Sequence, residues 1–221
     1  MTTTVDITLP ADGVRLEGTL GVPRPTHGVV LFAHGSGSSR FSPRNRAVAG
    51  ALHDHGFATL LLDLLTPQEE RVDAYTAELR FDVFMLARRL VAAVEWLTAA
   101  PDTAELPLGC FGASTGAASA LITAAERPDI VTAIVSRGGR PDLAGPSLGL
   151  VRAPTLLLVG GNDPVVIDLN RRAMAQMRAK VRLEIVPGAS HLFEEPGTLD
   201  IVAARAAAWF RHFTSRAGAA A

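Results

Sequence analysis

The first twenty residues contain two short segments in which apolar and polar positions alternate. Val5 to Leu9 and Val14 to Leu20 follow this period of two, and residues 11–13, Ala-Asp-Gly, have the composition of a tight turn between them. Such alternation is typical of strands with one buried face and one exposed face. The pattern therefore predicts a leading antiparallel β-hairpin.

Beyond this hairpin the apolar residues come in short continuous runs, which suit strands of a parallel sheet that are buried on both faces. The runs interpreted as strands are Gly28 to Ala33, Ala58 to Leu62, Leu108 to Phe111, Ile130 to Val135 and Thr155 to Val159, with Val181 to Val186 as the last strand.

Stretches in which apolar positions recur with a helical period separate these strands. The predicted helices are Asn45 to His55, Phe81 to Ala99, Ala117 to Ala125, Leu169 to Arg178 and, closing the chain, Leu199 to Phe213. Strands alternating with helices predict an α/β fold: a mostly parallel twisted sheet with helices on both faces. In such sheets the functional site lies beyond the carboxyl ends of the strands, so the loops after each strand are the ones to search.

The composition adds a domain count and excludes several classes of partner. With 221 residues, 48% of them hydrophobic and 19% charged, the chain has enough apolar material for one large core. We expect a single domain over residues 1–216 and a frayed tail over residues 217–221. A net charge of -1 provides no field that would attract nucleic acid or an anionic membrane, and neither is expected as a partner.

The single cysteine, Cys110, excludes an intramolecular disulfide, and no Cys and His cluster has the spacing of a zinc site. We therefore expect no bound metal. The first residues lack the basic and apolar regions of a secretory signal, and no apolar run is long enough to span a bilayer. These features favour a cytoplasmic protein.

The strongest chemical signal follows the strand that ends at Phe111. Residues 112–116 read Gly-Ala-Ser-Thr-Gly and precede an alanine-rich helix, which is the G-x-S-x-G nucleophile elbow in its strand-turn-helix setting. Small residues must flank Ser114 because the turn is sharp. The alternative is that Ser114 merely caps a helix.

The order of the remaining candidates favours catalysis. A serine hydroxyl is a weak nucleophile that needs a base, and the base needs an acid to fix its tautomer. Asp163 follows the strand Thr155 to Val159, and His191 follows the last strand, which is the order Ser, Asp, His of this fold. Asp142 and Asp168 are alternative acids, but Asp142 follows a long loop and Asp168 should already lie within a helix.

An oxyanion hole needs two N–H groups aimed at the oxygen that becomes negative during attack. The amide of Thr115, directly after the nucleophile, is one predicted donor. The loop His34-Gly35-Ser36-Gly37 follows a buried strand and should supply the other, for which Ser36 is the candidate. His34 itself is expected to brace this loop rather than to titrate in catalysis.

These motifs resemble the α/β-hydrolases of the dienelactone hydrolase type, which are small single-domain enzymes without a large cap. The matching stretches are HGSGSS at residues 34–39, GASTGA at 112–117, GGNDP at 160–164 and GASHLF at 188–193. Dienelactone hydrolases proper carry a cysteine nucleophile where this chain has Ser114, and this departure weighs against lactone hydrolysis of the dienelactone type. Cys110 lies before the elbow, inside the strand, and is interpreted as a core residue.

The resemblance extends to serine carboxylesterases and acyl thioesterases of similar length. It implies hydrolysis of a small-molecule ester or thioester through an acyl-enzyme, with no cofactor. An acyltransferase working with the same residues and a binding module that has lost its chemistry are the alternatives.

Several arginines fall near the expected rim of the site, on the loops after two of the strands. They are Arg40, Arg44, Arg46, Arg137 and Arg140. A basic rim on a nearly neutral protein favours a substrate that carries a carboxylate or phosphate. We single out Arg40 and Arg137 as candidates for substrate binding. The alternative is that these arginines form ion pairs that hold the loops together.

Overall fold

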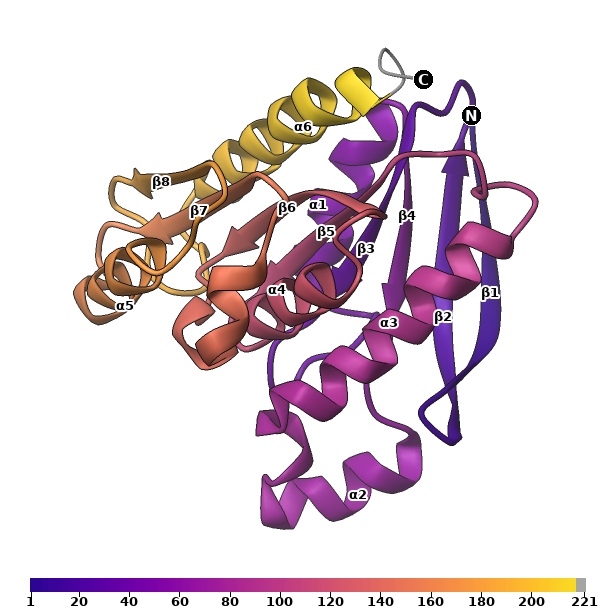
Figure 1. The fold of residues 1–221 in the computed structure, drawn as a ribbon, viewed down its shortest axis with the longest axis horizontal. Helices are drawn as coiled ribbons and strands as arrows, with labels where there is room; N and C mark the ends of the chain where they lie inside the picture. Colours follow the sequence, from indigo (N-terminus) through magenta and orange to yellow (C-terminus); the bar gives the residue numbers. More distant parts are fainter. Residues whose placement is uncertain (218–221) are drawn as a thin grey trace.

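A computed structural model of the chain describes residues 1–217 and has one eight-stranded sheet, with strand order β1-β2-β4-β3-β5-β6-β7-β8 (Figure 1). The strands are β1 (Thr2–Ala11), β2 (Val14–Pro23), β3 (Gly28–Ala33), β4 (Phe57–Leu62), β5 (Leu108–Ala113), β6 (Val131–Arg137), β7 (Thr155–Gly160) and β8 (Val181–Val186).

The predicted hairpin forms one end of this sheet. β1 pairs antiparallel with β2, and β2 pairs antiparallel with β4, whereas the pairs from β4 to β8 are all parallel. At the hairpin turn Asp12 and Gly13 both have positive φ, 46° and 81°, as a tight two-residue turn between twisted strands requires. The expected α/β-hydrolase fold with a leading antiparallel hairpin is thereby confirmed.

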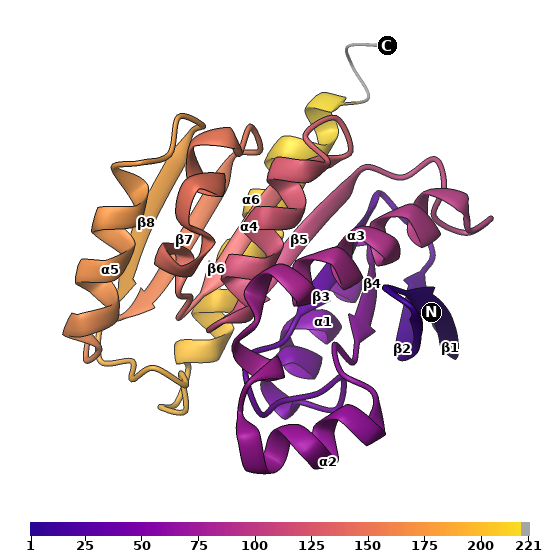
Figure 2. The ribbon, with the colours of Figure 1, turned by 60° about the horizontal axis from the view of Figure 1, so that its bottom comes forward.

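Helices cover both faces of the sheet. They are α1 (Pro43–Asp54), α2 (Pro67–Thr76), α3 (Val83–Ala99), α4 (Gly116–Glu126), α5 (Pro164–Met174) and α6 (Thr198–Ala217), with short 3-10 segments η1 (Leu79–Phe81) and η2 (Pro141–Leu150). Figure 2 shows α3, α4 and α5 on one face, while α1 and α6 pack together on the other. None of the described helices combines the length and the apolar character needed to cross a membrane.

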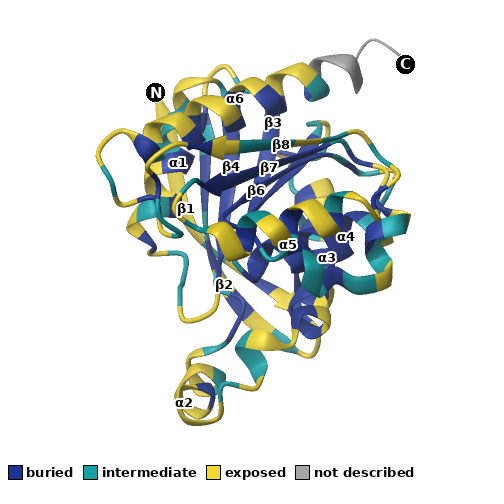
Figure 3. Ribbon diagram, turned by 90° about the vertical axis from the view of Figure 1, so that its left-hand side faces the viewer, coloured by how far each residue is buried: buried dark blue, intermediate teal, exposed yellow. Residues whose placement is uncertain are grey.

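The central strands are buried on both faces, which explains their continuous apolar sequences (Figure 3). On the face covered by α1 and α6, Phe32 of β3 stacks on Phe111 of β5 with ring centroids 4.8 Å apart. A Cβ at Gly109 would lie 2.6 Å from the ring of Phe210, so glycine at this position lets α6 approach the sheet closely.

Several elements differ from the sequence-based expectation, and three of these differences concern segments near the carboxyl edge of the sheet. α2 is absent from the helices predicted from the sequence. α5 begins at Pro164, not at Leu169, because Asp163 caps its N-terminus and Pro164 occupies the first turn. β6 continues two residues past Val135, so that Arg137 ends the strand instead of following it. Of the tail expected over residues 217–221, all but Ala217 lies outside the described residues.

The connecting segments at the carboxyl edge of the sheet contain only short helices. Between β6 and β7 the chain forms η2, and between β4 and α3 it forms α2 and η1. α2 projects from the body near the point where β4 ends (Figures 1 and 3). The residues that could cover the site thus come from the segment between β4 and α3.

Candidate active site

Ser114 stands at the turn between β5 and α4. It has φ +50°, a left-handed conformation that is unusual for a residue with a side chain. Backbone hydrogen bonds hold this conformation: the Ser114 N–H donates to the carbonyl of Arg137 at 3.2 Å, and the Ser114 carbonyl accepts from the N–H groups of Ala117 and Arg140 at 3.1 and 3.0 Å. The turn therefore has the strained geometry of a nucleophile elbow.

Glycines around this turn are required by the close approach of backbone segments. A Cβ at Gly112 would lie 2.4 Å from Cα of Ala117, and one at Gly116 would lie 2.3 Å from the carbonyl oxygen of Ala33. A side chain at either position would force α4 away from the sheet. The spacing of the motif is therefore imposed by packing at the elbow.

The structure brings the three predicted catalytic residues together. Oγ of Ser114 lies 3.4 Å from Nε2 of His191, and Nδ1 of His191 lies 2.7 Å from Oδ2 of Asp163. A carboxylate only accepts hydrogen bonds, so Nδ1 carries a proton and Nε2 presents its lone pair to the serine. The 3.4 Å contact is loose, and proton transfer requires it to shorten.

Gly160 allows the loop that carries Asp163 and the loop that carries His191 to lie in contact. A Cβ at Gly160 would lie 2.4 Å from the carbonyl oxygen of Ala189, so only glycine allows the end of β7 to approach the loop of His191 so closely. Asp163 also serves as the N-cap of α5, with Oδ1 3.4 Å from the N–H of Val166, while Oδ2 contacts His191. The cap fixes the direction of the carboxylate.

The two alternative acids have other partners. Asp142 accepts two hydrogen bonds from the guanidinium of Arg140, at 2.9 and 2.8 Å. Asp168 is exposed and forms an ion pair with Arg172 one turn later on α5. The arrangement favours Asp163 as the partner of His191.

The predicted oxyanion loop lies against the elbow, since a Cβ at Gly35 would be 3.0 Å from Cβ of Ser114. The N–H of Ser36 donates to Oγ1 of Thr115 at 2.9 Å. The two residues expected to supply the oxyanion hole are thus adjacent. However, the Ser36 N–H is occupied by the threonine hydroxyl, which must yield before that amide can bind an oxyanion.

His34 braces this loop. Its Nδ1 lies 2.9 Å from the carbonyl of Gly35, and its Nε2 accepts the N–H of Leu64 at 3.0 Å. Burial lowers the pKa of His34, which keeps the ring neutral, as the hydrogen bond from Leu64 to Nε2 requires. The imidazole therefore ties the oxyanion loop to the segment after β4.

A cavity of about 540 Å³ opens beside the oxyanion loop. The oxyanion loop and the start of α1 line one side of it, and the segment between β4 and α3 lines the other. Its lining residues include Gly35, Ser36, Phe41, Arg44, Leu65, Glu70 and Arg80. The cavity lies beside the elbow, because Gly35 lines it and also touches Ser114, although Ser114 and His191 do not themselves line it.

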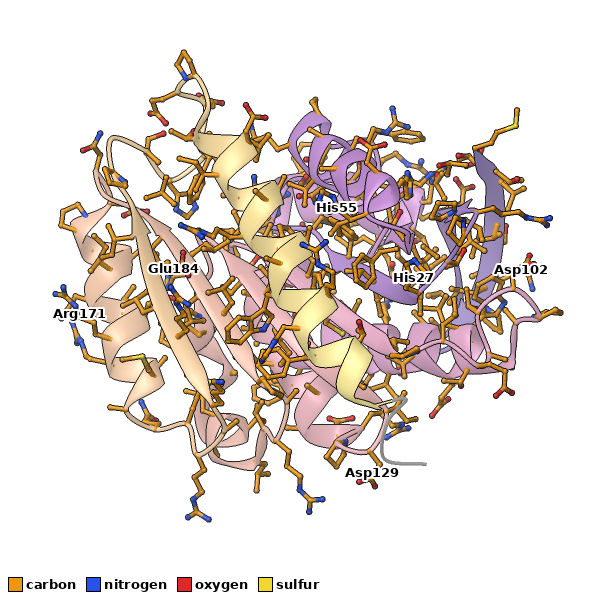
Figure 4. The ribbon with its side chains drawn as sticks, turned by 90° about the horizontal axis from the view of Figure 1, so that it is seen from above. His27, His55, Asp102, Asp129, Arg171 and Glu184 are labelled. Carbon is orange, nitrogen blue, oxygen red and sulfur yellow. The ribbon has the colours of Figure 1, made fainter. Side chains whose placement is uncertain are left out.

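Burial raises the pKa of the Cys110 thiol to about 12. This cysteine lies inside β5 and is fully buried, so its thiolate is not available as a nucleophile. His27 and His55, labelled in Figure 4, lie at the amino ends of β3 and β4, the opposite edge from His191. Among the described residues no group of three or more His, Cys, Asp and Glu side chains is placed to hold a metal ion.

The two arginines singled out from the sequence have different surroundings. The guanidinium of Arg40 pairs with Asp63 and lies 2.8 Å from Glu17, and its backbone N–H also donates to Asp63. These contacts favour the interpretation that Arg40 holds its loop. Arg137 is buried and forms no ion pair with any residue that the structure describes. Arg44, which the sequence did not distinguish from its neighbours, lines the cavity.

Comparison with known protein families and proteins finds matches that cover most of the chain. The model of the dienelactone hydrolase family matches residues 16–216. A protein of Mycobacterium tuberculosis strain H37Rv, provisionally named a phosphoribosyl transferase, is 58% identical over 205 residues. That match covers 93% of this chain but 45% of the relative. The chain therefore spans less than half the length of this relative.

Among solved structures, a dienelactone hydrolase from Anabaena variabilis superimposes with a TM-score of 0.94 at 55% identity, covering 96% of this chain and 99% of that one. The esterase Est1E from Butyrivibrio proteoclasticus superimposes with a TM-score of 0.78 at 16% identity, covering 95% and 99%. The second similarity shows the shared fold alone.

Proposed function

Because the chain belongs to the dienelactone hydrolase family, we propose that it is a serine hydrolase that cleaves a carboxylic ester or thioester through an acyl-enzyme. The observation that carries the proposal is the hydrogen-bonded line from Ser114 through His191 to Asp163 at the carboxyl edge of the sheet. A binding module would not need a strained serine, a base and an acid in this order.

The chemistry follows from the positions of these groups. Nε2 of His191 accepts the proton of Ser114 as Oγ attacks the carbonyl carbon, and Asp163 stabilises the imidazolium that forms. The oxyanion is bound by the N–H of Thr115 and by the N–H of Ser36 once the Thr115 hydroxyl releases it. His191 then returns the proton to the leaving alcohol or thiol. Water activated by the same imidazole hydrolyses the acyl-serine and frees the enzyme.

We do not extend the transferase name of the Mycobacterium tuberculosis relative to this chain. That name describes a protein more than twice as long as the matched segment, which covers 45% of it. The arrangement of Ser114, His191 and Asp163 supports attack on a carbonyl carbon by a serine. We therefore assign a hydrolase activity to this segment.

Turnover of a panel of nitrophenyl esters and an acyl thioester tests this function. We expect Ser114→Ala to lower kcat/KM on every accepted substrate by about 10⁴ or more, because no other group can form the acyl-enzyme. Ser147→Ala is a matched control, since Ser147 lies in η2 and has no place in the site. Equal turnover by the wild type and Ser114→Ala would refute the proposal.

A further inference from the structure

Arg137 is a buried cation that has no counter-ion among the described residues. The residue is 7% exposed, and its Nε and Nη1 are buried with no hydrogen-bond partner. Arg89, which is 3% exposed, is the other arginine among the described residues that is buried to this degree, and it donates to both carboxylate oxygens of Glu69, at 2.6 and 2.8 Å. A buried charge normally has such a partner because its desolvation is costly. Arg137 therefore requires another explanation.

The main chain at Arg137 lies beside the reacting groups. Its carbonyl accepts the N–H of Ser114 at 3.2 Å, and a Cβ on the next residue, Gly138, would lie 3.6 Å from Cε1 of His191. Nη2 of Arg137 has no hydrogen-bond partner among the described residues either, but unlike Nε and Nη1 it is not completely buried. Two nitrogens of the guanidinium are thus fully buried, and the third is accessible to a binding partner.

A second arginine lies close by on another element. Arg44 stands in the first turn of α1, which contains no acidic residue, and it lines the cavity beside the oxyanion loop. Its guanidinium lies 3.2 Å from Glu194, in the loop that carries His191. Burial, with repulsion from Arg44 as a second cause, lowers the pKa of Arg137 to about 10. Arg137 remains a cation at neutral pH, and Glu194 balances only one of the two charges.

We propose that Arg137 and Arg44 form a binding site for an anionic group, a carboxylate or a phosphate, on the substrate of this hydrolase. The inference rests on the proposed function, because it places the group next to Ser114. A substrate anion would supply the counter-charge that Arg137 lacks, and the burial of Arg137 weakens the screening of this attraction by water. The unpaired cation then destabilises the free protein, and binding of the substrate anion offsets this destabilisation.

A substrate-binding role and a structural role for Arg137 predict different effects of its replacement on thermal stability. An arginine that holds loops together does so through hydrogen bonds, as Arg40 does with Asp63 and Glu17. Replacing an unpaired buried charge by an apolar side chain of similar length removes a desolvation cost. We therefore expect Arg137→Met to melt at or above the temperature of the wild type and Arg40→Met to melt below it. Melting of Arg137→Met as low as Arg40→Met would overturn the inference.

Kinetics on two esters of matched length test the binding role. Nitrophenyl hemisuccinate carries a carboxylate on its acyl group, and nitrophenyl butyrate is neutral. We expect Arg137→Met to lower the kcat/KM ratio of the first ester to the second by about 10- to 150-fold, the loss of one charge-assisted hydrogen bond. Arg40→Met should change both esters alike. A ratio that moves less than about threefold in Arg137→Met would contradict the proposed site.

Anion-dependent melting separates this inference from the proposed function. Succinate or inorganic phosphate, added at constant ionic strength, should raise the melting temperature of the wild type but not of Arg137→Met. A response to only one of them identifies the group that the site accepts. If the wild type hydrolyses neither ester but shows the Arg137-dependent shift, the hydrolase proposal fails while the anion site stands. Equal shifts in both proteins, or none in either, would count against the site.

Discussion

At Ser114 a strained backbone and an accessible side chain have the same cause. The φ of +50° costs about 1–2 kcal/mol for a residue with a Cβ, and hydrogen bonds to Arg137, Ala117 and Arg140 hold it in place. The conformation directs Oγ to His191, whose other nitrogen contacts Asp163. The hydrogen bond that Nδ1–H of His191 donates to Asp163 determines which nitrogen of the imidazole carries the proton and leaves Nε2 facing Ser114.

The role of Asp163 can be tested by a nearly isosteric change. Asp163→Asn should lower kcat/KM by about 10³–10⁴, because an amide N–H facing Nδ1 favours the tautomer that has its proton on Nε2. Asp142→Asn and Asp168→Asn, whose carboxylates pair with Arg140 and Arg172, serve as controls and should cost less than about tenfold. Steady-state kinetics on one accepted ester decides the assignment. A larger loss in either control would move the acid to that position.

At the scale of elements, the strands and the turns that follow them were predictable because both leave local signals. Continuous apolar runs identified the buried strands, and the residues after β5, β7 and β8 supplied Ser114, Asp163 and His191. The burial of Arg137 was not predictable, because it depends on two further residues of β6. No local pattern in the sequence reports that kind of packing.

α2 escaped prediction for a different physical reason. Its sequence lacks an apolar stripe, and Asp73 is its only buried residue. The signals present were at its start, where Pro67 occupies the first turn and Thr66 and Glu69 form a capping box, with contacts of 2.8 and 3.2 Å. The helix is held to the body by ion pairing, since Glu69 also binds the buried Arg89 of α3.

This attachment leads to a prediction for the segment that flanks the cavity. Glu69→Gln should lower the free energy of unfolding by about 1.5–3 kcal/mol, because it leaves the guanidinium of Arg89 buried without a counter-charge. Glu78→Gln is a control, because Glu78 lies on the same segment, is exposed and has no ion pair among the described residues. Urea denaturation of both variants measures the difference. An equal, small effect in the two variants would show that the ion pair between Glu69 and Arg89 does not stabilise the segment between β4 and α3.

For the whole molecule, two apolar cores lie on opposite faces of one sheet and share its strands. Trp96 of α3 packs against the core on one face, and Trp209 of α6 belongs to the core on the other. They are the two tryptophans of the chain. Each therefore reports on one face of the sheet.

We expect the two faces to unfold together, as in a single domain. Trp96→Phe leaves only the fluorescence of Trp209, and Trp209→Phe leaves only that of Trp96. In each variant the urea midpoint measured by fluorescence should coincide with the midpoint measured by far-UV circular dichroism. Midpoints that separate between the probes in one variant would mean that the two layers unfold independently.

The central claim is that Ser114 is the nucleophile, and covalent labelling tests it most directly. A fluorophosphonate reacts with a serine only where a base and an oxyanion hole activate it. Intact-protein mass spectrometry should show one adduct on the wild type, located on the peptide that contains Ser114, and none on Ser114→Ala of equal thermal stability. An unlabelled wild type, or labelling of Ser114→Ala to the same extent, would contradict the account.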